Sequence, residues 1–556
     1  MNGIRIKILA ALKSGLFSNT RLPVLAVVGF VILTPALQRT AGAQGSRTLI
    51  KPTATLTAKA AVSRTPEEID QAKTSMGPVQ PGTVVPSFRP TTDASSYQAA
   101  KQAVATGATA RPATSAPAPL APPALAGVNF NGVAEGTSCQ PFVCAPPDTH
   151  GAVGLNNFVE ITNSRISIYT KAGTLVKSVS LNAFFGIPSS AATFLVDPRV
   201  VYDRTWDRWV ITANQFNITS TEQFFFIAAS KTGNPGGAFF KYEVDMDTSD
   251  NGDVFDYPQL GLDQDAVIFT GNVFNSSDVF QYAEMFAVAK ARLYNGLGFN
   301  VPIFTGLDGT LAPPIVLDDS SNTFLVAAPA AVGGTAITKY TLTNSSRPDA
   351  TALSASTITV DSYTIPQNAS QPGTAAVLDT LDARFVNAST QIGDSLWNVH
   401  TIDVDGIFPT PRFYEFDTDA DTVLQSGLFF ASGSSHDWNA SIAVNDLAEA
   451  FVTWSSTDPA NSINARVMFS GRQPGDTLGS MNAAPGGTVL FTSPTFYNDF
   501  TCPFCRWGDY SAVTLDPKAY SITGGTCDAG RRAWIVNEKI NSQTIWGSRI
   551  GRIGFC

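Results

Sequence analysis

A short apolar strand that ends in Asp or Asn at a turn recurs along this chain, and a second apolar strand follows each copy. The clearest copies are Pro198–Asp203, Pro258–Asp263, Pro313–Asp318 and Ser511–Asp516, and looser copies end at Asn156, Asp379 and Asn445. The terminal positions lie on average 60 residues apart. Further strand-like stretches such as Gln223–Ala228 lie between the copies. Four short strands per repeat are typical of one blade of a β-propeller.

Seven copies of the repeat predict an all-β fold, a seven-bladed β-propeller, with six or eight blades as the nearest alternatives. The composition agrees, because 44% of the residues are hydrophobic, 36 are Phe and only 15% are charged. No long stretch keeps a helical period of apolar residues. A β-solenoid would need shorter and more uniform repeats, and two β-sandwich domains would not explain seven copies.

The first 43 residues have the pattern of a secretory signal peptide. Basic residues precede an apolar run from Leu22 to Leu37, and Ala41-Gly42-Ala43 supplies the small residues of a cleavage site. The alternative is a membrane anchor, but this run contains Pro23 and Pro35 and is shorter than the ~20 residues that a spanning helix needs. We therefore expect a secreted protein, or a periplasmic or cell-surface one, with no membrane span after cleavage.

Residues 44–126 are rich in Ala, Thr, Pro and Ser and contain few large apolar side chains. Such a segment cannot offset the entropy lost on ordering, so we predict a disordered or extended linker. Short helices around Thr65–Lys73 and Tyr97–Val104 are the exceptions that the pattern allows. The β-propeller domain is then expected to span residues 127–556.

The net charge limits the partners that we expect, and the cysteines indicate disulfide bonds. The net charge of −9 argues against nucleic acid as a partner. The cysteines are Cys139, Cys144, Cys502, Cys505, Cys527 and Cys556. In an exported protein they predict disulfide bonds, whose pairing the sequence leaves open. A redox or zinc role for Cys502-Pro-Phe-Cys505 is the alternative, but a second such pair is missing.

Several blade motifs also carry a resemblance. Pro147–Gly154, Asp197–Arg204, Asp256–Gly261, Leu378–Asp382 and Arg506–Ser511 stand in this order. The set resembles the blade motifs of a mostly uncharacterised group of exported bacterial β-propeller proteins, which are loosely similar to sialidase-type (BNR-like) propellers. The resemblance covers about residues 128–553 and implies the fold and export. It implies no settled activity.

Residues just before each inner strand of a propeller should converge at one mouth of its central channel, the usual place for a binding site. The predicted binding residues are His150, Tyr257, His436, Trp438, Arg506 and Trp507. Candidate catalytic carboxylates are Asp197, Asp256, Asp437 and Asp509, joined in the predicted ring by Asp148. Each of these residues also has a structural interpretation, because Asp and Trp at blade starts often tie neighbouring blades together.

An acidic insert is the candidate metal site. Asp245, Asp247, Asp250 and Asp253 surround a Gly turn, as an oxygen-ligated cation such as Ca²⁺ requires. Asp417–Asp421 is a second candidate for calcium. Neither segment fits the twelve-residue calcium loop, so a solvated acidic turn is the alternative. No other cofactor is indicated.

Three functions remain open from the sequence. The first is a binding module, expected as a monomer, that recognises an extracellular glycan or protein through its loop face, with Tyr257, Trp438 and Trp507 as stacking rings. The second is a polysaccharide hydrolase or lyase with paired carboxylates at the mouth. The third is a structural protein of the cell envelope. The arginine cluster and nucleophile motif of a sialidase are not recognisable.

Overall fold

The computed structural model describes residues 47–72, 91–102, 122–138, 143–188, 193–217, 223–328, 333–482, 485–517 and 531–555. All of them belong to one compact unit that runs from Gln44 to Cys556. The predicted signal peptide lies outside the described residues. No helix in these ranges is long and apolar enough to cross a membrane.

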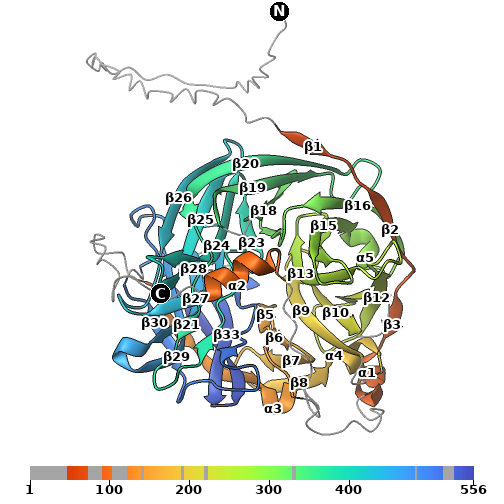
Figure 1. Ribbon diagram of the computed structural model, residues 1–556. Coiled ribbons are helices and arrows are strands. Elements are labelled where there is room, and N and C mark those ends of the chain that lie inside the picture. The colour runs from red at the N-terminus through yellow and green to blue at the C-terminus, as the bar shows by residue number, and fades with distance from the viewer. Residues whose placement is uncertain are drawn as a thin grey trace, which may run out of the picture. The chain divides into compact units, whose positions relative to one another are not determined.

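Antiparallel sheets make up most of the described chain, and they surround a common axis (Figure 1). The first sheet holds β5 (His150–Val153), β6 (Asn157–Thr162), β7 (Arg165–Thr170) and β8 (Leu175–Ser180). The next holds β9 (Thr193–Asp203), β10 (Arg208–Asn217), β11 (Phe224–Ser230) and β12 (Phe239–Asp245). It is followed by β13 (Val254–Leu262), β14 (Ala266–Phe274), β15 (Phe280–Ala289) and β16 (Phe299–Leu307).

The pattern continues through the second half of the chain. β17 (Pro314–Val316) precedes β18 (Asn322–Ala327), β19 (Gly334–Thr343) and β20 (Ala352–Tyr363). Then come β23 (Ser389–Ile392), β24 (Ser395–Val404), β25 (Phe408–Asp417) and β26 (Thr422–Leu428). β27 (His436–Val444), β28 (Ala450–Asp458), β29 (Ile463–Arg472) and β30 (Thr488–Thr492) form the next sheet. The last consists of β32 (Ala512–Leu515), β33 (Arg532–Ser542), β34 (Ile545–Gly554) and β4 (Ala124–Ala134).

The innermost strands follow one another around the axis in chain order. β5, β9, β13, β17, β23, β27 and β32 each contact the next, and β32 contacts β5 again. The final sheet combines the two ends of the propeller-like unit, because β4 pairs with β34 near the C-terminus. A closed ring of sheets leaves only short edges at the axis, and the neighbouring inner strands protect them. The predicted mostly β, propeller-like fold is therefore confirmed.

The turns after the inner strands explain most of the sequence repeat. Asp203 accepts the amide hydrogens of Thr205 and Trp206, and Asp263 accepts those of Asp265 and Ala266. An Asp that bonds to the backbone two or three residues on fixes a tight turn. The repeated Asp therefore shapes the hairpin that leads to the second strand of each sheet.

The copy that ends at Asp379 was wrongly assigned. The inner strand of that sheet is β23, which ends 13 residues later, at Ile392. Asp379 instead follows β22 (Val377–Leu378), which joins β21 (Ala369–Ser370) and β31 (Phe504–Cys505) in a small separate sheet. The sequence pattern failed here because this insertion is also apolar and also ends in Asp.

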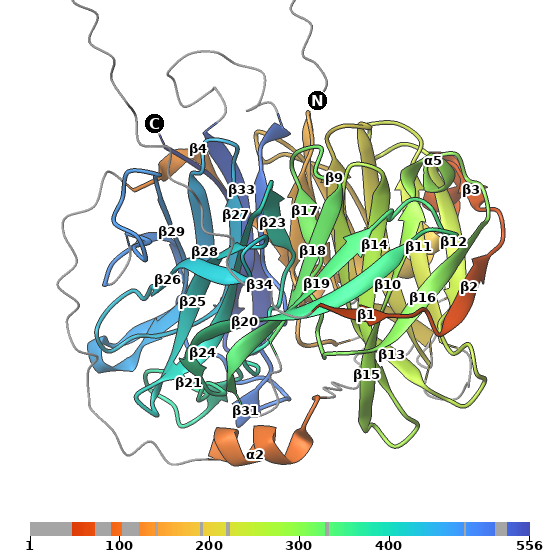
Figure 2. The same cartoon turned by 90° about the horizontal axis from the view of Figure 1, so that it is seen from above.

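The predicted linker is wrong for part of its length. β1 (Thr48–Ile50), β2 (Ala54–Ala58) and β3 (Val62–Arg64) add as outermost strands to β20, β16 and β12, respectively. Figure 2 shows this segment along the outside of three consecutive sheets. This segment is ordered because its backbone pairs with the outer edges of these sheets, although its own composition favours disorder. Residues 73–90 and 103–121 lie outside the described part.

Five short helices accompany the strands in the described ranges. α1 (Pro66–Ala72) lies within the predicted stretch Thr65–Lys73, and α2 (Ala94–Gln102) overlaps the predicted stretch Tyr97–Val104 but begins three residues earlier. The others are α3 (Glu135–Ser138), α4 (Leu181–Phe185) and α5 (Lys290–Leu293), and a 3-10 turn, η1, spans Pro459–Asn461. α2 lies across one end of the axis, beside β21 and β31 (Figures 1 and 2).

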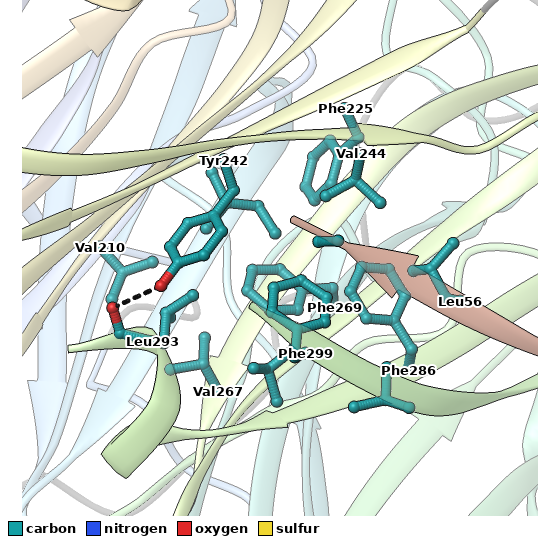
Figure 3. Close-up of a cluster of buried hydrophobic side chains, with 14 of the residues drawn as sticks. Leu56, Val210, Phe225, Tyr242, Val244, Val267, Phe269, Phe286, Leu293 and Phe299 are labelled. Carbon is teal, nitrogen blue, oxygen red and sulfur yellow. Dashed lines mark hydrogen bonds between the residues drawn. The ribbon is translucent and has the colours of Figure 1, made fainter. Parts of the chain in front are cut away.

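Apolar side chains from neighbouring sheets form the cores. Phe225, Phe269 and Phe286 lie between the β9–β12 and β13–β16 sheets, with Phe225 edge-on to both of the other rings. Leu56 of β2 packs into the same cluster and is only 2% exposed (Figure 3). The N-terminal segment therefore completes a core.

Among the described cysteines, Cys502 and Cys505 form a disulfide bond. Cys144 is also disulfide-bonded. The Cys502–Cys505 bond lies in the loop that leads into β31, next to the small sheet. The prediction of disulfide bonds is confirmed at these positions.

The packing of Leu56 predicts the energetic role of the N-terminal segment. Leu56→Ala should lower the free energy of unfolding by about 2–4 kcal/mol, because it leaves a cavity in a shared core. Chemical denaturation followed by tryptophan fluorescence measures this. The control is Leu49→Ala in β1, whose side chain is 67% exposed and whose loss should cost less than about 0.5 kcal/mol. Equal effects of the two changes would contradict this role.

Candidate functional site

Left-handed backbone turns aim polar side chains at one end of the axis. Asp197, Tyr257 and Asn439 have φ values of 51°, 53° and 50° in β9, β13 and β27. In β13 and β27 these residues coincide with breaks in the pairing register. A bulge of this type redirects a side chain, and positive φ in non-glycine residues is often found at functional sites. Asp148, just before β5, has a φ of 46°.

The side chains that meet here include the carboxyl groups of Asp148, Asp197, Asp256 and Asp509, which we call the axial acidic cluster. Asp148 accepts hydrogen bonds from the Asn163 amide at 2.6 Å and from the Asp509 backbone N–H at 2.7 Å. Burial raises the pKa of Asp148 to about 8, and the charges of Asp509 and Asp197 act in the same direction. The sequence prediction that Asp148, Asp197, Asp256 and Asp509 converge is supported by these contacts.

Asp197 and Asp256 form a hydrogen bond between their carboxyl groups, so one of them carries a proton. Burial and the neighbouring charge of Asp256 raise the pKa of Asp197 well above the usual range. Asp197 also accepts the backbone N–H of Tyr257 at 3.2 Å. Two carboxyl groups at such short range cannot both be ionised, because like charges repel strongly at that distance.

Arg199 crosses the axis below this cluster. From β9 its guanidinium donates to Pro258 O at 3.0 Å, to Val386 O at 3.0 Å and to Asn387 Oδ1 at 2.9 Å. Pro258 belongs to β13, and residues 386 and 387 lead into β23 on another side of the ring. The guanidinium also lies 3.4 Å above the ring centre of Tyr510. One side chain thus connects β9 with β13 and with the segments that lead into β23 and β32 (Ala512–Leu515).

An axial cavity of about 120 Å³ lies on the other side of Arg199. Its walls come mostly from the later residues of the inner strands, including Val201, Leu262, Ala443 and Val513. His150 also lines this cavity and is not among the mouth residues. Burial and the charge of Arg199 lower the pKa of His150 well below its usual value, so the imidazole is neutral.

A larger pocket, which we call the mouth pocket, has a volume of about 550 Å³. It lies between α2, the Cys502–Cys505 loop and the insertion that carries β21 and β22. Its lining residues are Thr91, Ala94, Tyr97, Gln98, Lys101, Gln102, Asn368, Asp379, Phe500, Thr501, Phe504 and Arg506. Arg506 connects the pocket to the axial acidic cluster, since its Nη2 lies 3.5 Å from Asp509 Oδ2.

The predicted stacking role of Tyr257, Trp438 and Trp507 is wrong. These rings are 3%, 1% and 1% exposed. Trp438 and Trp507 pack edge to face at 5.4 Å, and the Trp507 indole donates to Ser455. Aromatic residues at blade starts fill the space between converging sheets here, so their faces are covered by protein. The exposed rings at the mouth are instead Phe500 and Phe504, at 43% and 56% exposure.

Asp437 and His436 have different surroundings from the axial acidic cluster. Asp437 accepts hydrogen bonds from the Trp454 indole at 2.9 Å, the Ser435 hydroxyl at 2.6 Å and the Ala431 backbone N–H. His436 packs against the Phe408 ring. Asp437 is therefore a structural acceptor, and its candidacy as an acid or base is not supported.

The predicted calcium sites are not supported either. In the described ranges, no group of three or more His, Cys, Asp or Glu side chains is placed to hold a metal ion. Asp247 accepts the backbone N–H groups of Asn251 and Gly252, and Asp253 accepts the side-chain amide of Asn251. At Asp417–Asp421, Asp417 accepts the N–H groups of Asp419 and Ala420. These carboxylates stabilise their own turns.

Several residues of the site were missed in the sequence. Arg384 binds Asp382 through two 2.7 Å contacts and lies 4.5 Å from the Tyr257 ring centre. Arg199 lies inside the repeat copy Pro198–Asp203. The residues around it predict a strand but give no sign of its contacts across the axis. Phe500 precedes the disulfide loop and Phe504 lies inside it, and the one available signal was their position beside these cysteines. Both rings line the mouth pocket together with residues of the insertion that carries β21 and β22. The repeat pattern assigns that insertion to a blade strand.

Comparisons with known proteins give distant structural matches. No family model matches this sequence, and no curated protein matches it. A sialidase from Trypanosoma rangeli matches with 8% identity over 73% of this chain and 58% of its own length, at a TM-score of 0.33. An exo-beta-1,3-galactanase from Phanerochaete chrysosporium matches with 11% identity, 61% and 80% coverage and a TM-score of 0.30.

A third match is the N10 neuraminidase-like protein of A/little yellow-shouldered bat/Guatemala/060/2010. It shows 7% identity over 64% of this chain and all of its own, at a TM-score of 0.34. The aligned part of this chain therefore spans less than two thirds of the Trypanosoma sialidase.

The position of Arg199 predicts a large loss of stability when it is replaced. Arg199→Met removes the donor of Pro258 O and Asn387 Oδ1, whereas Val386 O keeps a hydrogen bond from Gln259. At about 1–3 kcal/mol for each acceptor that loses its donor, the free energy of unfolding should fall by at least about 2 kcal/mol. Arg199→Lys should rescue little of it, because one ammonium cannot reproduce the planar fork. Thermal and chemical denaturation measure this, with the exposed Arg347→Met as the control. A loss below 1 kcal/mol would contradict the role of Arg199.

The axial acidic cluster predicts an unusual pH dependence. An acid whose pKa is raised on folding contributes stability that is complete below its unfolded pKa of about 4. That contribution is lost as the pH rises through the folded value, which is about 8 for Asp148. Asp197→Asn keeps a donor for Asp256 and an acceptor for Tyr257 N–H. This variant should therefore unfold with a weaker pH dependence than wild type between pH 5 and 9.

The matched control is Asp437→Asn. Its amide oxygen can still accept from Trp454 and Ala431, but its NH2 group would face the Ser435 hydroxyl, which donates to the carboxylate of wild type. This variant should therefore lose about 1–3 kcal/mol at all pH values. Denaturation midpoints across the pH range separate the two variants. If Asp197→Asn followed the wild-type slope, the shared proton would be placed wrongly.

Proposed function

We propose that this protein binds a neutral oligosaccharide in the mouth pocket, as an exported and monomeric seven-bladed β-propeller. The observation that carries the proposal is the pairing of two exposed aromatic rings, Phe500 and Phe504, with polar side chains around a pocket of about 550 Å³. This volume lies within the range of about 300–1,000 Å³ that is usual for small-molecule sites.

The chemistry of the lining fits a sugar. Aromatic faces pack on the apolar C–H faces of pyranose rings, while amides, hydroxyls and charged groups bond the sugar hydroxyls. Outside α2, Asn368 supplies an amide and Thr501 supplies a hydroxyl. Among the same residues, Arg506 is cationic and Asp379 is anionic. Because these charges balance, a neutral glycan is favoured over an acidic one.

The fold supports the seven-blade assignment through its ring of inner strands and through the closure of the last sheet by β4. The N-terminal strands cover the outer edges of three sheets, which favours a soluble monomer because unpaired edges promote association. The disulfide-bonded Cys502 and Cys505 fit an oxidising compartment, as the predicted signal peptide requires.

Glycoside hydrolysis has weaker support. Standard mechanisms place the two carboxyl groups about 5–10 Å apart, with the sugar between them. Asp197 and Asp256 are instead hydrogen-bonded to each other. A pair in direct contact has no space for a glycosidic bond, so we assign these residues to the support of the site.

Binding is tested with cello-, xylo-, manno- and galacto-oligosaccharides of four to six residues, by calorimetry on the secreted chain. Phe500→Ala and Phe504→Ala should each weaken binding about 10-fold, which corresponds to about 1.4 kcal/mol. Trp206→Ala removes an aromatic residue that is 41% exposed on the β9–β10 hairpin and should leave affinity unchanged. No binding to any of these sugars would overturn the proposal, and release of reducing ends would favour the hydrolase.

A further inference from the structure

α2 lies over the mouth pocket and is attached through two side chains one helical turn apart. Tyr97 and Lys101 are its buried residues, at 8% and 9% exposure. The spacing of four residues places both side chains on the same face of the helix. That face lines the mouth pocket, together with Gln98 and Gln102.

The anchors of α2 are polar. The Tyr97 hydroxyl contacts both carboxylate oxygens of Asp379, at 2.6 and 2.7 Å. Lys101 Nζ donates to Thr380 Oγ1 at 2.7 Å and to Pro366 O at 2.9 Å, and it lies 3.6 Å from Asp379 Oδ1. All three acceptor residues belong to the insertion around β21 and β22. α2 is thus held by the same wall that a ligand would contact.

Within the described ranges, the contacts that anchor α2 to the insertion are polar rather than apolar. Tyr97 and Lys101 belong to none of the hydrophobic clusters found among the described residues. α2 has nine residues, and an isolated helix of this length is marginal in water. Its start is fixed locally, because Asp93 accepts the Ser96 N–H at 2.9 Å as an N-cap. Elements with few buried apolar contacts open at low free energy.

We propose that α2 is a releasable cover of the mouth pocket, in which Tyr97 and Lys101 occupy the polar groups that a ligand uses in the open state. This inference rests on the proposed function, since it describes the regulation of the same site. The hydroxyl of Tyr97 and the ammonium of Lys101 satisfy Asp379 and Thr380 when no ligand is present. Sugar hydroxyls replace them when α2 leaves.

The population of the open state then sets the apparent affinity. When only a fraction of molecules is binding-competent, the apparent dissociation constant rises in inverse proportion to that fraction. A change that weakens the anchors should therefore tighten ligand binding. If α2 were a fixed wall of the site, the same change would remove ligand contacts and weaken binding. The sign of the effect distinguishes the two arrangements.

The test uses the full secreted chain with the double change Tyr97→Phe and Lys101→Gln, which keeps the ring and most of the length of both side chains. Hydrogen–deuterium exchange of residues 94–102 should be about 10-fold faster than in wild type. Phenylglyoxal should modify Arg506 faster, because α2 no longer shields the pocket. Both measurements need no glycan. Tyr202→Phe is the matched control, since it removes a Tyr–Asp hydrogen bond on the β9–β10 hairpin.

Binding of cellotetraose, xylotetraose and mannotetraose completes the test. The double variant should bind the recognised sugar about 10-fold more tightly than wild type. Unchanged exchange and unchanged Arg506 modification would overturn the cover, and so would weaker sugar binding. If neither protein bound any of the sugars while exchange and modification both increased, the glycan proposal would fail and the releasable cover would stand.

Discussion

The contact of Arg199 with three acceptors across the axis is the constraint on which the rest of this structure depends. Inner strands that converge on an axis leave a channel, and a channel through the centre weakens the packing between opposite sheets. The guanidinium fills it with donors that reach Pro258, Val386 and Asn387 and with a flat face that covers Tyr510. It also separates the axial cavity from the axial acidic cluster, so the two ends of the axis differ in chemistry.

Burial explains why the axial acidic cluster supports the site more readily than it catalyses a reaction. Asp148 and Asp197 hold neighbouring backbone N–H groups in place, and their pKa values are raised because charge is costly in the interior. Arg506 links this rigid base to the more open mouth pocket. The groups with exposed surface, Phe500 and Phe504, belong to the disulfide loop and the small sheet. The proposed recognition of a ligand thus falls to elements outside the ring of inner strands.

The sequence predicted the mostly β fold, the turn aspartates and the meeting of Asp148, Asp197, Asp256 and Asp509, because those features repeat with the strands. It misplaced Asp379 because an apolar insertion ended by Asp is locally identical to a blade strand. It also predicted a linker where β1, β2 and β3 are ordered. Their order comes from pairing with distant sheet edges, which local composition cannot reveal.

The sequence by itself determined the repeat, and with it where every inner strand except β23 ends, since hydrophobic periodicity and turn residues act over a few residues. Only the tertiary structure decided which polar and aromatic groups are exposed. Trp438 and Trp507 are covered because sheets converge on them, whereas Phe500 and Phe504 stay exposed at and before β31, which belongs to the small sheet and not to the ring of inner strands. Exposure depends on neighbours that are far away in the chain, and these are fixed only when the sheets pack.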